Sequence, residues 1–365
     1  MMPLAFLVVV VFAAAEPLKG WRRLAADDPA KMERMESPIA RSMHASVFDP
    51  ASDKMWITGG LVRWNGQQGC PNDTWSLDFK TDQWTCLSED QKNLSGRYGH
   101  AAAFDPVGKQ LLLVGGEAMI GPTGKFLGDT WALAVGAVKW KRVKADGVLP
   151  ARHGHTVTYD PTRRRLIVVG GVGGSSTLRG VWMESVWTFN LQTQEWREIA
   201  VEGKNLPPRN FHTTVLDPAR DRLLVIGGIV GPGSGSAKGD VWAFDLKTDT
   251  WQEASPQPLL AARWGHAAAL DEEGDRLFVV GGAPGPGKPL LASDLWCLDL
   301  KQMKWECVPV ETRLPPLNTH SMVWDPARRR LVVFGGNKGR YFSGEVWVLD
   351  VGPASPAASP GLKSE

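Results

Sequence analysis

Six histidines recur along this chain at a spacing that could build a metal site. They follow one another at intervals of 54 to 57 residues, and imidazole is a common protein ligand for transition metals. The six are His44, His100, His155, His212, His266 and His320. Because all six occupy one position of a repeating pattern, we expect them to support the repeat rather than to bind a metal. The seventh, His153, lies outside the pattern and is expected in an exposed loop.

Arginine occupies the position three residues before five of these histidines. The five are Arg41, Arg97, Arg152, Arg209 and Arg263, and Leu317 stands in the sixth place. A guanidinium group presents a fork of donors that suits a carboxylate. A broken ring of such groups would recognise an acidic peptide or a sugar acid. Pairing with acids of neighbouring loops, such as Glu89 or Asp146, would instead make the arginines structural.

Other candidate catalytic or ligand-binding side chains lie in segments that we expect to form loops. Glu117 is the only carboxylate directly after a Gly-Gly pair, so it is the best candidate for a general acid or base; a solvated loop carboxylate is the plainer alternative. Trp64, Phe126 and Tyr341 stand in or beside variable loops, where aromatic side chains can bind sugars or peptides. Gly231–Gly239 lacks the Lys-Ser/Thr ending of a phosphate-binding loop. We therefore assign no catalytic residue and no cofactor.

Gly-Gly pairs mark the repeat that must position these residues. The pairs are Gly59-Gly60, Gly115-Gly116, Gly170-Gly171, Gly227-Gly228, Gly281-Gly282 and Gly335-Gly336. An Asp-Pro turn separates the histidine from the glycines in five of the six units, and two tryptophans nine residues apart follow in five, as Trp75 and Trp84 do. Each unit therefore predicts four short strands. The second is a continuous apolar run such as Leu111–Val114, typical of a strand buried on both faces.

The last unit lacks its second tryptophan, and the first residues of the repeat region supply one. Trp347 is followed by a Pro- and Ser-rich segment, whereas Trp21 stands alone near the other end. We therefore expect residues 20–24 to pair with residues 345–350 and to close a ring, which removes an exposed sheet edge. The predicted fold class is all-β: a six-bladed β-propeller with four antiparallel strands per blade and the last blade closed by the N-terminal strand.

The pattern resembles the kelch-repeat family. The resemblance rests on the Arg-x-x-His motif, the apolar strand ending in Gly-Gly and the paired aromatics, and it covers residues 20–350. It implies a propeller and leaves the function open, because family members bind actin, acidic peptides or sugars and a minority are enzymes. The copper site of galactose-oxidase-like relatives is not expected, because Tyr98, Tyr159 and Tyr341 are the only tyrosines and form no copper motif.

The ends of the chain and its charge limit the remaining possibilities. Leu4–Ala15 is an apolar run that ends in small residues, so we expect a signal peptide at residues 1–15, the propeller at 16–352 and a disordered tail at 353–365. The run is too short to span a bilayer, and we expect no membrane insertion. The formal net charge of +2 gives no basic signature for nucleic acid.

The four cysteines are expected to form two disulfides in an exported protein. Cys297 and Cys307 would lie opposite each other across a turn centred on Gln302, and Cys86 shares the repeat position of Cys307, which leaves Cys70 as its partner. The predicted pairs are thus Cys70–Cys86 and Cys297–Cys307.

Together these features predict an exported, monomeric, non-enzymatic binding module. It would be secreted or periplasmic and would recognise a protein or glycan ligand. The ligand would bind the face that carries the inter-blade loops and the loops between second and third strands. Two alternatives stay open: an exported sugar-modifying enzyme similar to a sialic-acid mutarotase, and an intracellular kelch adaptor.

Overall fold

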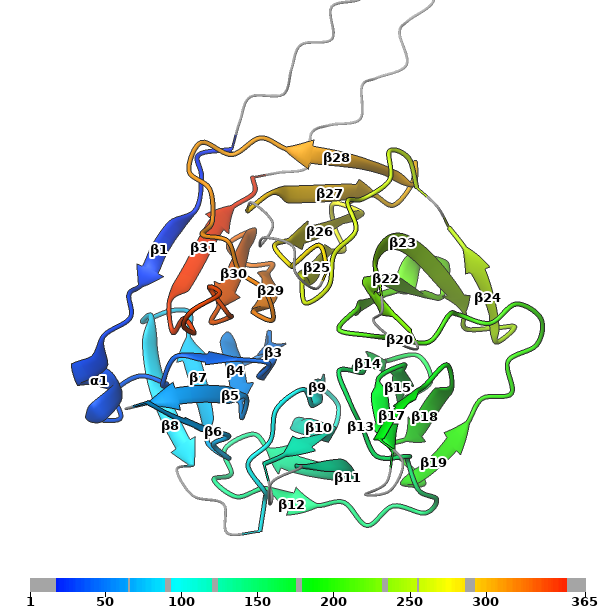
Figure 1. Ribbon diagram of the computed structural model, residues 1–365, viewed down its shortest axis with the longest axis horizontal. Coiled ribbons are helices and arrows are strands. Elements are labelled where there is room, and N and C mark those ends of the chain that lie inside the picture. The colour runs from blue at the N-terminus through cyan, green and yellow to red at the C-terminus, as the bar shows by residue number, and fades with distance from the viewer. Residues whose placement is uncertain are drawn as a thin grey trace, which may run out of the picture.

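Six sheets that share one order of four strands surround a central axis, and two smaller three-stranded sheets accompany them (Figure 1). The computed structural model describes residues 18–352 except for 65, 89–92, 120–123, 175–178, 232–235, 255 and 286–292. The predicted signal peptide and the predicted tail lie outside the described residues. Within them, no helix has the length and apolar character needed to cross a membrane. The β-propeller fold predicted from the repeats is confirmed.

Each sheet, numbered here as a blade in chain order, runs from an innermost to an outermost strand. The innermost strands are β3 (Ala45–Asp49), β9 (Ala101–Asp105), β14 (Thr156–Asp160), β21 (Thr213–Asp217), β25 (Ala267–Asp271) and β29 (Ser321–Asp325). The second strands are β4 (Lys54–Thr58), β10 (Gln110–Ala118), β15 (Arg165–Val169), β22 (Arg222–Val230), β26 (Arg276–Val280) and β30 (Arg330–Phe334).

The outer half of each blade follows the same order. The third strands are β7 (Thr74–Asp78), β11 (Lys125–Ala134), β18 (Val186–Asn190), β23 (Ser236–Asp245), β27 (Leu295–Asp299) and β31 (Val346–Asp350). The outermost strands are β8 (Gln83–Ser88), β12 (Lys141–Arg142), β19 (Glu195–Glu198), β24 (Thr250–Glu253), β28 (Lys304–Val308) and, in blade six, β1 (Arg22–Ala25).

Short additional elements extend the blades beyond the Gly-Gly pairs or link them. They are β2 (Arg41–Ser42), β5 (Leu61–Trp64), β6 (Gln67–Gly69), β13 (Arg152–His153), β16 (Val172–Gly174), β17 (Arg179–Trp182), β20 (Arg209–Asn210), α1 (Pro29–Glu33) and the 3-10 turn η1 (Pro218–Arg220). β2, β13 and β20 pair with the chain just after a Gly-Gly pair. The residues before each histidine therefore lie on the face of the ring that carries the loops between second and third strands.

The second strands form the core, as their continuous apolar runs predict. Leu111–Val114 of β10 and Leu166–Val169 of β15 are each at most 1% exposed. They have neighbouring strands on both sides in their own sheet and pack against the adjacent blades on both faces. Burial on both faces explains why these strands show no polar alternation.

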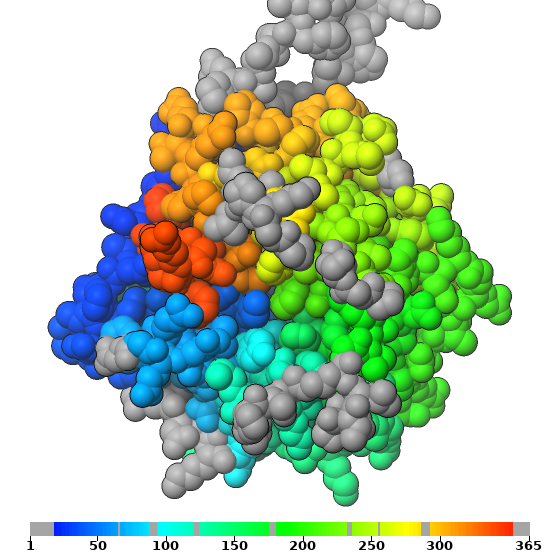
Figure 2. Space-filling model, in the orientation of Figure 1, coloured from blue at the N-terminus to red at the C-terminus, as the bar shows by residue number. Residues whose placement is uncertain are grey.

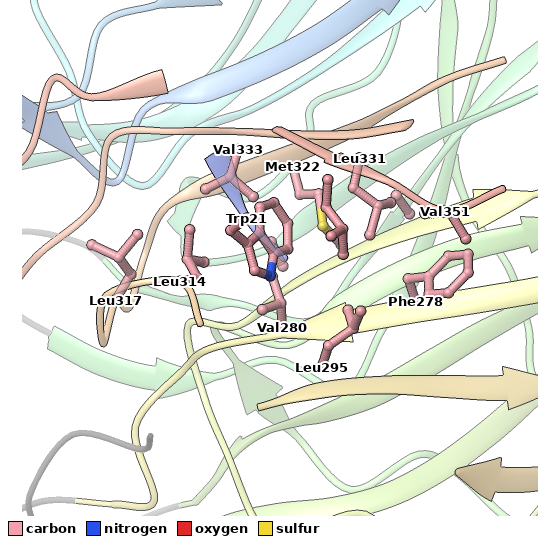
Figure 3. Close-up of a cluster of buried hydrophobic side chains, with 13 residues drawn as sticks. Trp21, Phe278, Val280, Leu295, Leu314, Leu317, Met322, Leu331, Val333 and Val351 are labelled. Carbon is pink, nitrogen blue, oxygen red and sulfur yellow. The ribbon is translucent and has the colours of Figure 1, made fainter. Parts of the chain in front are cut away.

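The ring closes between the two ends of the chain, as predicted. β1 pairs antiparallel with β31, with Arg22 opposite Val348. Trp21, just before β1, is 2% exposed and packs with side chains of blades five and six, including Val280 and Leu331 (Figure 3). The N-terminal strand thus supplies both the missing outer strand and an aromatic side chain to the core.

The Asp-Pro turns lie at the opposite face and carry ion pairs between blades. At three junctions an arginine of one turn contacts an aspartate of the next blade at 2.7–2.8 Å. The pairs are Arg163–Asp221, Arg220–Asp275 and Arg328–Asp53. This face is therefore cross-linked by side chains that are already paired.

Neither predicted disulfide is present among the described residues. In blade five the strand register places Cys297 opposite Glu306 and Cys307 opposite Trp296, so the expected pairing was wrong by one residue and the two thiols lie on opposite sides of the sheet. The expected bond between Cys70 and Cys86 is likewise not formed. Burial raises the pKa of both Cys70 and Cys297 to about 12, so neither thiol is reactive at neutral pH.

Candidate functional site

The five repeat arginines lie inside the blades and not at a channel rim. Each is at most 2% exposed. In four blades the guanidinium holds a carboxylate of the third strand, or just before it, through two hydrogen bonds of 2.6–3.1 Å. The pairs are Arg41–Asp73, Arg97–Asp129, Arg209–Asp240 and Arg263–Asp294. The expected ring of accessible arginines is therefore wrong, and internal ion pairing takes its place.

Each pair is part of a larger polar contact. In blade one, Arg41 also donates to the carbonyl oxygen of Gly59 at 2.9 Å, and the Trp75 indole donates to Asp73 at 2.8 Å. In blade two, burial opposes ionisation of Asp129, yet the hydrogen bonds and charge of Arg97 outweigh it and lower the pKa of Asp129. The motif thus ties the start of the blade to its Gly-Gly pair and its first tryptophan.

The repeat histidines join neighbouring blades. Each lies against the first glycine of the preceding Gly-Gly pair, where an added Cβ would approach the imidazole to within 3.0 Å. His100, for example, hydrogen-bonds to the carbonyl oxygen of Thr58 in blade one at 3.1 Å. Burial and the nearby arginine lower the pKa of His100 and of His212 to about 3. Among the described residues no three His, Cys, Asp or Glu side chains gather as metal ligands.

A closed circle of backbone hydrogen bonds surrounds the central channel directly before these histidines. One residue of each blade donates its N–H to the carbonyl oxygen of its counterpart in the preceding blade, at 2.6–3.0 Å. We call these residues the collar: Met43, Gly99, Gly154, Phe211, Gly265 and Thr319. The collar and the six histidines line a cavity of about 150 Å³ at the axis. The innermost strands are thereby held around a fixed opening.

All six collar residues have positive φ, between 50° and 64°. Glycine adopts this conformation without strain, but Met43, Phe211 and Thr319 do not, and each costs about 1–3 kcal/mol in backbone strain. Such strain is often retained where a side chain has a functional place. These three side chains therefore mark the channel opening as a candidate site.

Two further residues of each blade surround the collar. Together with the collar and the loop side chains beside them, they form what we call the mouth. The residue before the collar pairs through its backbone with the residue after the Gly-Gly pair. The six pairs are Ser42/Leu61, Tyr98/Glu117, His153/Val172, Asn210/Ile229, Trp264/Ala283 and Asn318/Asn337. The residue types differ in every blade, although the flanking Arg, His and Gly-Gly positions scarcely vary.

Blades two to five contribute an aromatic arc to the mouth. The ring of His153 lies 6.1 Å from Tyr98, 5.2 Å from Phe126 and 5.8 Å from Phe211. Phe211 in turn lies 5.6 Å from Trp264. His153 is therefore not in an exposed loop as expected: its side chain is 16% exposed and belongs to β13.

Glu117, the candidate acid or base, lies in this arc. Its carboxylate is 3.5 Å from His153 Nδ1, and its side chain is 9% exposed. The plainer alternative, a solvated loop carboxylate, is thus wrong. The pair brings together two groups of the types that transfer protons in enzymes.

Blades six and one form a polar half of the mouth. A cavity of about 220 Å³ between them is lined by Arg63, Gln68, Asn337, Arg340 and Tyr341, among others. Figure 2 shows this face, where the orange-red segment of blade six lies beside the blue segment of blade one. Tyr341 is 60% exposed. The half-buried Trp64 stands at the end of β5, one residue after Arg63.

The sequence reasoning placed Phe126, Tyr341 and Glu117 at or beside the mouth but missed most of its residues. Tyr98, Asn210, Phe211 and Trp264 lie between the arginine and the histidine of their repeats. The signal that could have found them is variation between repeats: within Arg-x-x-His and its blade-six equivalent, no two blades carry the same pair of inner residues.

Comparisons with known proteins agree with this architecture. A family model described as the KLHDC2/KLHL20/DRC7 Kelch-repeats domain matches residues 28–228 and 212–355. Adagio-like protein 3 of Oryza sativa subsp. japonica is 30% identical over 68% of this chain and 40% of its own length. Kelch domain-containing protein 10 of Xenopus tropicalis is 25% identical over 76% of this chain and 67% of its own length.

The Adagio relatives are longer proteins, and this chain spans about 40% of their length. A solved structure titled "Structure of YjhT" superimposes with a TM-score of 0.65 at 15% identity, covering 85% of this chain and 95% of that one. At that identity the likeness concerns the fold alone. The match of the family model over nearly the whole repeat region, together with the six repeats, shows that this chain belongs to the kelch-repeat family.

Proposed function

We propose that this chain is a binding module whose mouth recognises a protein or glycan ligand. The observation that carries the proposal is the convergence of variable side chains from all six blades on a collar made of backbone groups. Kelch domains commonly bind proteins, and ligand sites of propellers are built from loops on a rigid scaffold. Monomeric binding is the simplest arrangement, since the mouth is complete within one chain.

The two halves of the mouth favour a ligand with an apolar and an anionic side. Half-buried aromatic rings such as Phe211 and Trp264 offer flat surfaces for a sugar ring or an apolar side chain. Arg63 and Arg340, both exposed, line the polar cavity and suit a carboxylate. These two arginines replace the buried repeat arginines as candidates for anion recognition.

The test is a peptide and glycan array probed with the purified chain and two mouth variants. Phe211→Gly removes the ring and relieves the positive φ, and Trp264→Ala removes the neighbouring ring. Both should keep the melting temperature within a few degrees and lose at least tenfold in affinity for the wild-type ligands. Val107→Ala, at an exposed Asp-Pro turn on the opposite face, serves as the control. Ligands that bind both mouth variants normally would exclude the mouth.

A second candidate function is proton transfer on a sugar, as expected for the mutarotase-like alternative. The observation that favours it is the Glu117–His153 contact within the aromatic arc. Glu117→Gln should leave binding intact and slow anomer interconversion of a bound reducing sugar, followed by NMR exchange spectroscopy. If Glu117→Gln leaves every measured rate unchanged, the site is a binding site alone.

We further propose that the chain is exported, on the strength of the apolar run Leu4–Ala15. The two predicted disulfides are not formed, so they give no support to an oxidising compartment. Mass spectrometry of the mature N-terminus separates the alternatives. Cleavage after Ala15 supports secretion or a periplasmic location, whereas an intact Met1 in cell extract supports the intracellular adaptor.

A further inference from the structure

In four blades the repeat arginine forms the same ion pair, with which the arginine of blade three can be compared. In blade four, Arg209 Nη2 donates to Asp240 at 2.9 Å, and the Trp242 indole donates to the same oxygen at 2.9 Å. Blades one, two and five repeat this arrangement with Asp73, Asp129 and Asp294. The guanidinium is therefore neutralised by one carboxylate that also accepts from a tryptophan.

Blade three keeps the arginine and the tryptophan but not the acid. Ser185 stands two residues before Trp187, at the position of those aspartates. The Trp187 indole donates to the Ser185 hydroxyl at 3.2 Å. Arg152 donates to the carbonyl oxygens of Pro150 and Gly170, and its Nη2 has no hydrogen-bond partner among the described residues.

Arg152 is thus a buried cation without a paired acid. It is 0% exposed, and burial lowers its pKa to about 10, a shift that the charge of Glu198 opposes. Glu198 lies on the exposed side of β19 and forms no hydrogen bond with the guanidinium. A buried charge without a counterion costs several kcal/mol, and none of the four paired arginines bears that cost.

We propose that blade three binds a small monovalent anion of the size of chloride between Arg152 and Ser185. The anion would accept hydrogen bonds from Arg152 Nη2 and from the Ser185 hydroxyl, whose oxygen already accepts from Trp187. It would supply the negative charge that a carboxylate supplies in blades one, two, four and five. The replacement of a carboxylate by a hydroxyl limits the site to a compact anion, because the surrounding strands keep the repeat geometry.

Exchange of residues between blades three and four provides the test. Thermal and urea unfolding are followed while sodium chloride replaces sodium gluconate at constant ionic strength. For a site with a dissociation constant of about 10 mM, 100 mM chloride should lower the unfolding equilibrium constant of the wild type about tenfold. Ser185→Asp should be more stable than the wild type in gluconate and should lose this saturable response. Asp240→Ser in blade four should acquire a second response.

Crystals grown with sodium bromide provide an independent measurement by anomalous scattering. A bromide peak within hydrogen-bond distance of Arg152 Nη2 is expected in the wild type and should be absent in Ser185→Asp. An equal chloride response in the wild type and in Ser185→Asp would overturn the proposal. A bromide peak without any stabilisation by chloride would show an adventitious ion only and would also overturn it.

Discussion

Blades three and six have each lost one half of the repeat's ion pair, with opposite results. In blade six, Leu317 replaces the arginine and Glu345 replaces the aspartate. Glu345 accepts hydrogen bonds from Lys338, Arg23 and Trp347, so its charge is neutralised by cations from outside the motif. In blade three, Arg152 remains and finds no acid among the described residues.

The difference follows from where each charge lies. Glu345 is beside the closing strand and the loop before β31, and flexible side chains from both reach it. Arg152 is fully buried, and its guanidinium donates to the carbonyl oxygens of Pro150 and Gly170 in its own blade. Replacement of the arginine by Leu317 also added an apolar side chain to the cluster around Trp21. Other cationic side chains thus replace the lost arginine of blade six, whereas among the described residues no acidic side chain replaces the lost aspartate of blade three.

Lowering the pH should have the largest effect on stability, because it acts on the buried repeat histidine that both blades contain. Burial lowers the pKa of every repeat histidine, to about 4 for His320 in blade six and further for His155 in blade three. The unfolded value is about 6.5, so below that pH the unfolded chain takes up protons that the folded chain does not. Each histidine should then cost about 1.4 kcal/mol per pH unit. The melting temperature, measured from pH 7.5 to 4.5, should fall steeply below 6.5; a flat profile would contradict the neutral, buried histidines.

Removal of the closing strand should have the next largest effect and should disrupt blade six and its packing against blade five. A chain beginning at residue 27 lacks Trp21, Arg23 and β1. Burial of one tryptophan contributes about 3–5 kcal/mol, and the unpaired edge of β31 should promote aggregation. Comparison with a chain beginning at residue 16, by thermal unfolding and light scattering, checks this. Equal melting temperatures would show that the ring does not depend on the N-terminal strand.

Substitution of the arginine should separate an intact blade from blade three. Arg41→Met leaves Asp73 buried without its cation and should cost about 3–5 kcal/mol. Arg152→Met removes an unpaired charge, so its cost should be limited to the two lost hydrogen bonds, about 1–2 kcal/mol. Urea unfolding of both variants measures the difference. If the two variants lose equal free energy of unfolding, the absence of an acid partner does not reduce the contribution of Arg152 to stability.

The smallest effect concerns the substitute cation of blade six. Lys338→Met removes one of the two cations that contact Glu345 and should cost roughly 1–2 kcal/mol, since both side chains are largely buried. Lys304→Met, which breaks an exposed pair with Glu306, should change stability by less than about 0.5 kcal/mol. A Lys338→Met variant as stable as the control would mean that Arg23 alone is enough to neutralise the charge of Glu345.

The fold could be predicted because its signals repeat. Six copies of the Gly-Gly pair fixed the blade boundaries, and the unmatched Trp347 and Trp21 identified the closing strand. The cysteine pairs could not be predicted, because a shift of one residue in the β27–β28 register moves a side chain to the other side of the sheet. The direction of the arginine side chains was missed for a related reason: their acid partners stand 31 or 32 residues later on another strand.

The mouth was harder to predict than the blades because no residue type recurs there in all six blades. A periodic pattern reveals the positions that every blade needs, such as His100 or Gly59, and these serve the scaffold. Tyr98, His153 and Trp264 do not belong to this repeated set, and their rings contact side chains of neighbouring blades at the mouth. Their contacts depend on the curvature of the ring, which no single repeat encodes.

The collar has a consequence for protein engineering. Its six hydrogen bonds use only backbone groups, so the circle holds its diameter whichever side chains stand beside it. The six positions before the collar could therefore be randomised together as a combinatorial library, with the conformation of each position already set by its neighbours. Such a library would vary the side chains around an opening of constant size. Variants could then be selected for new ligands without a separate selection for stability.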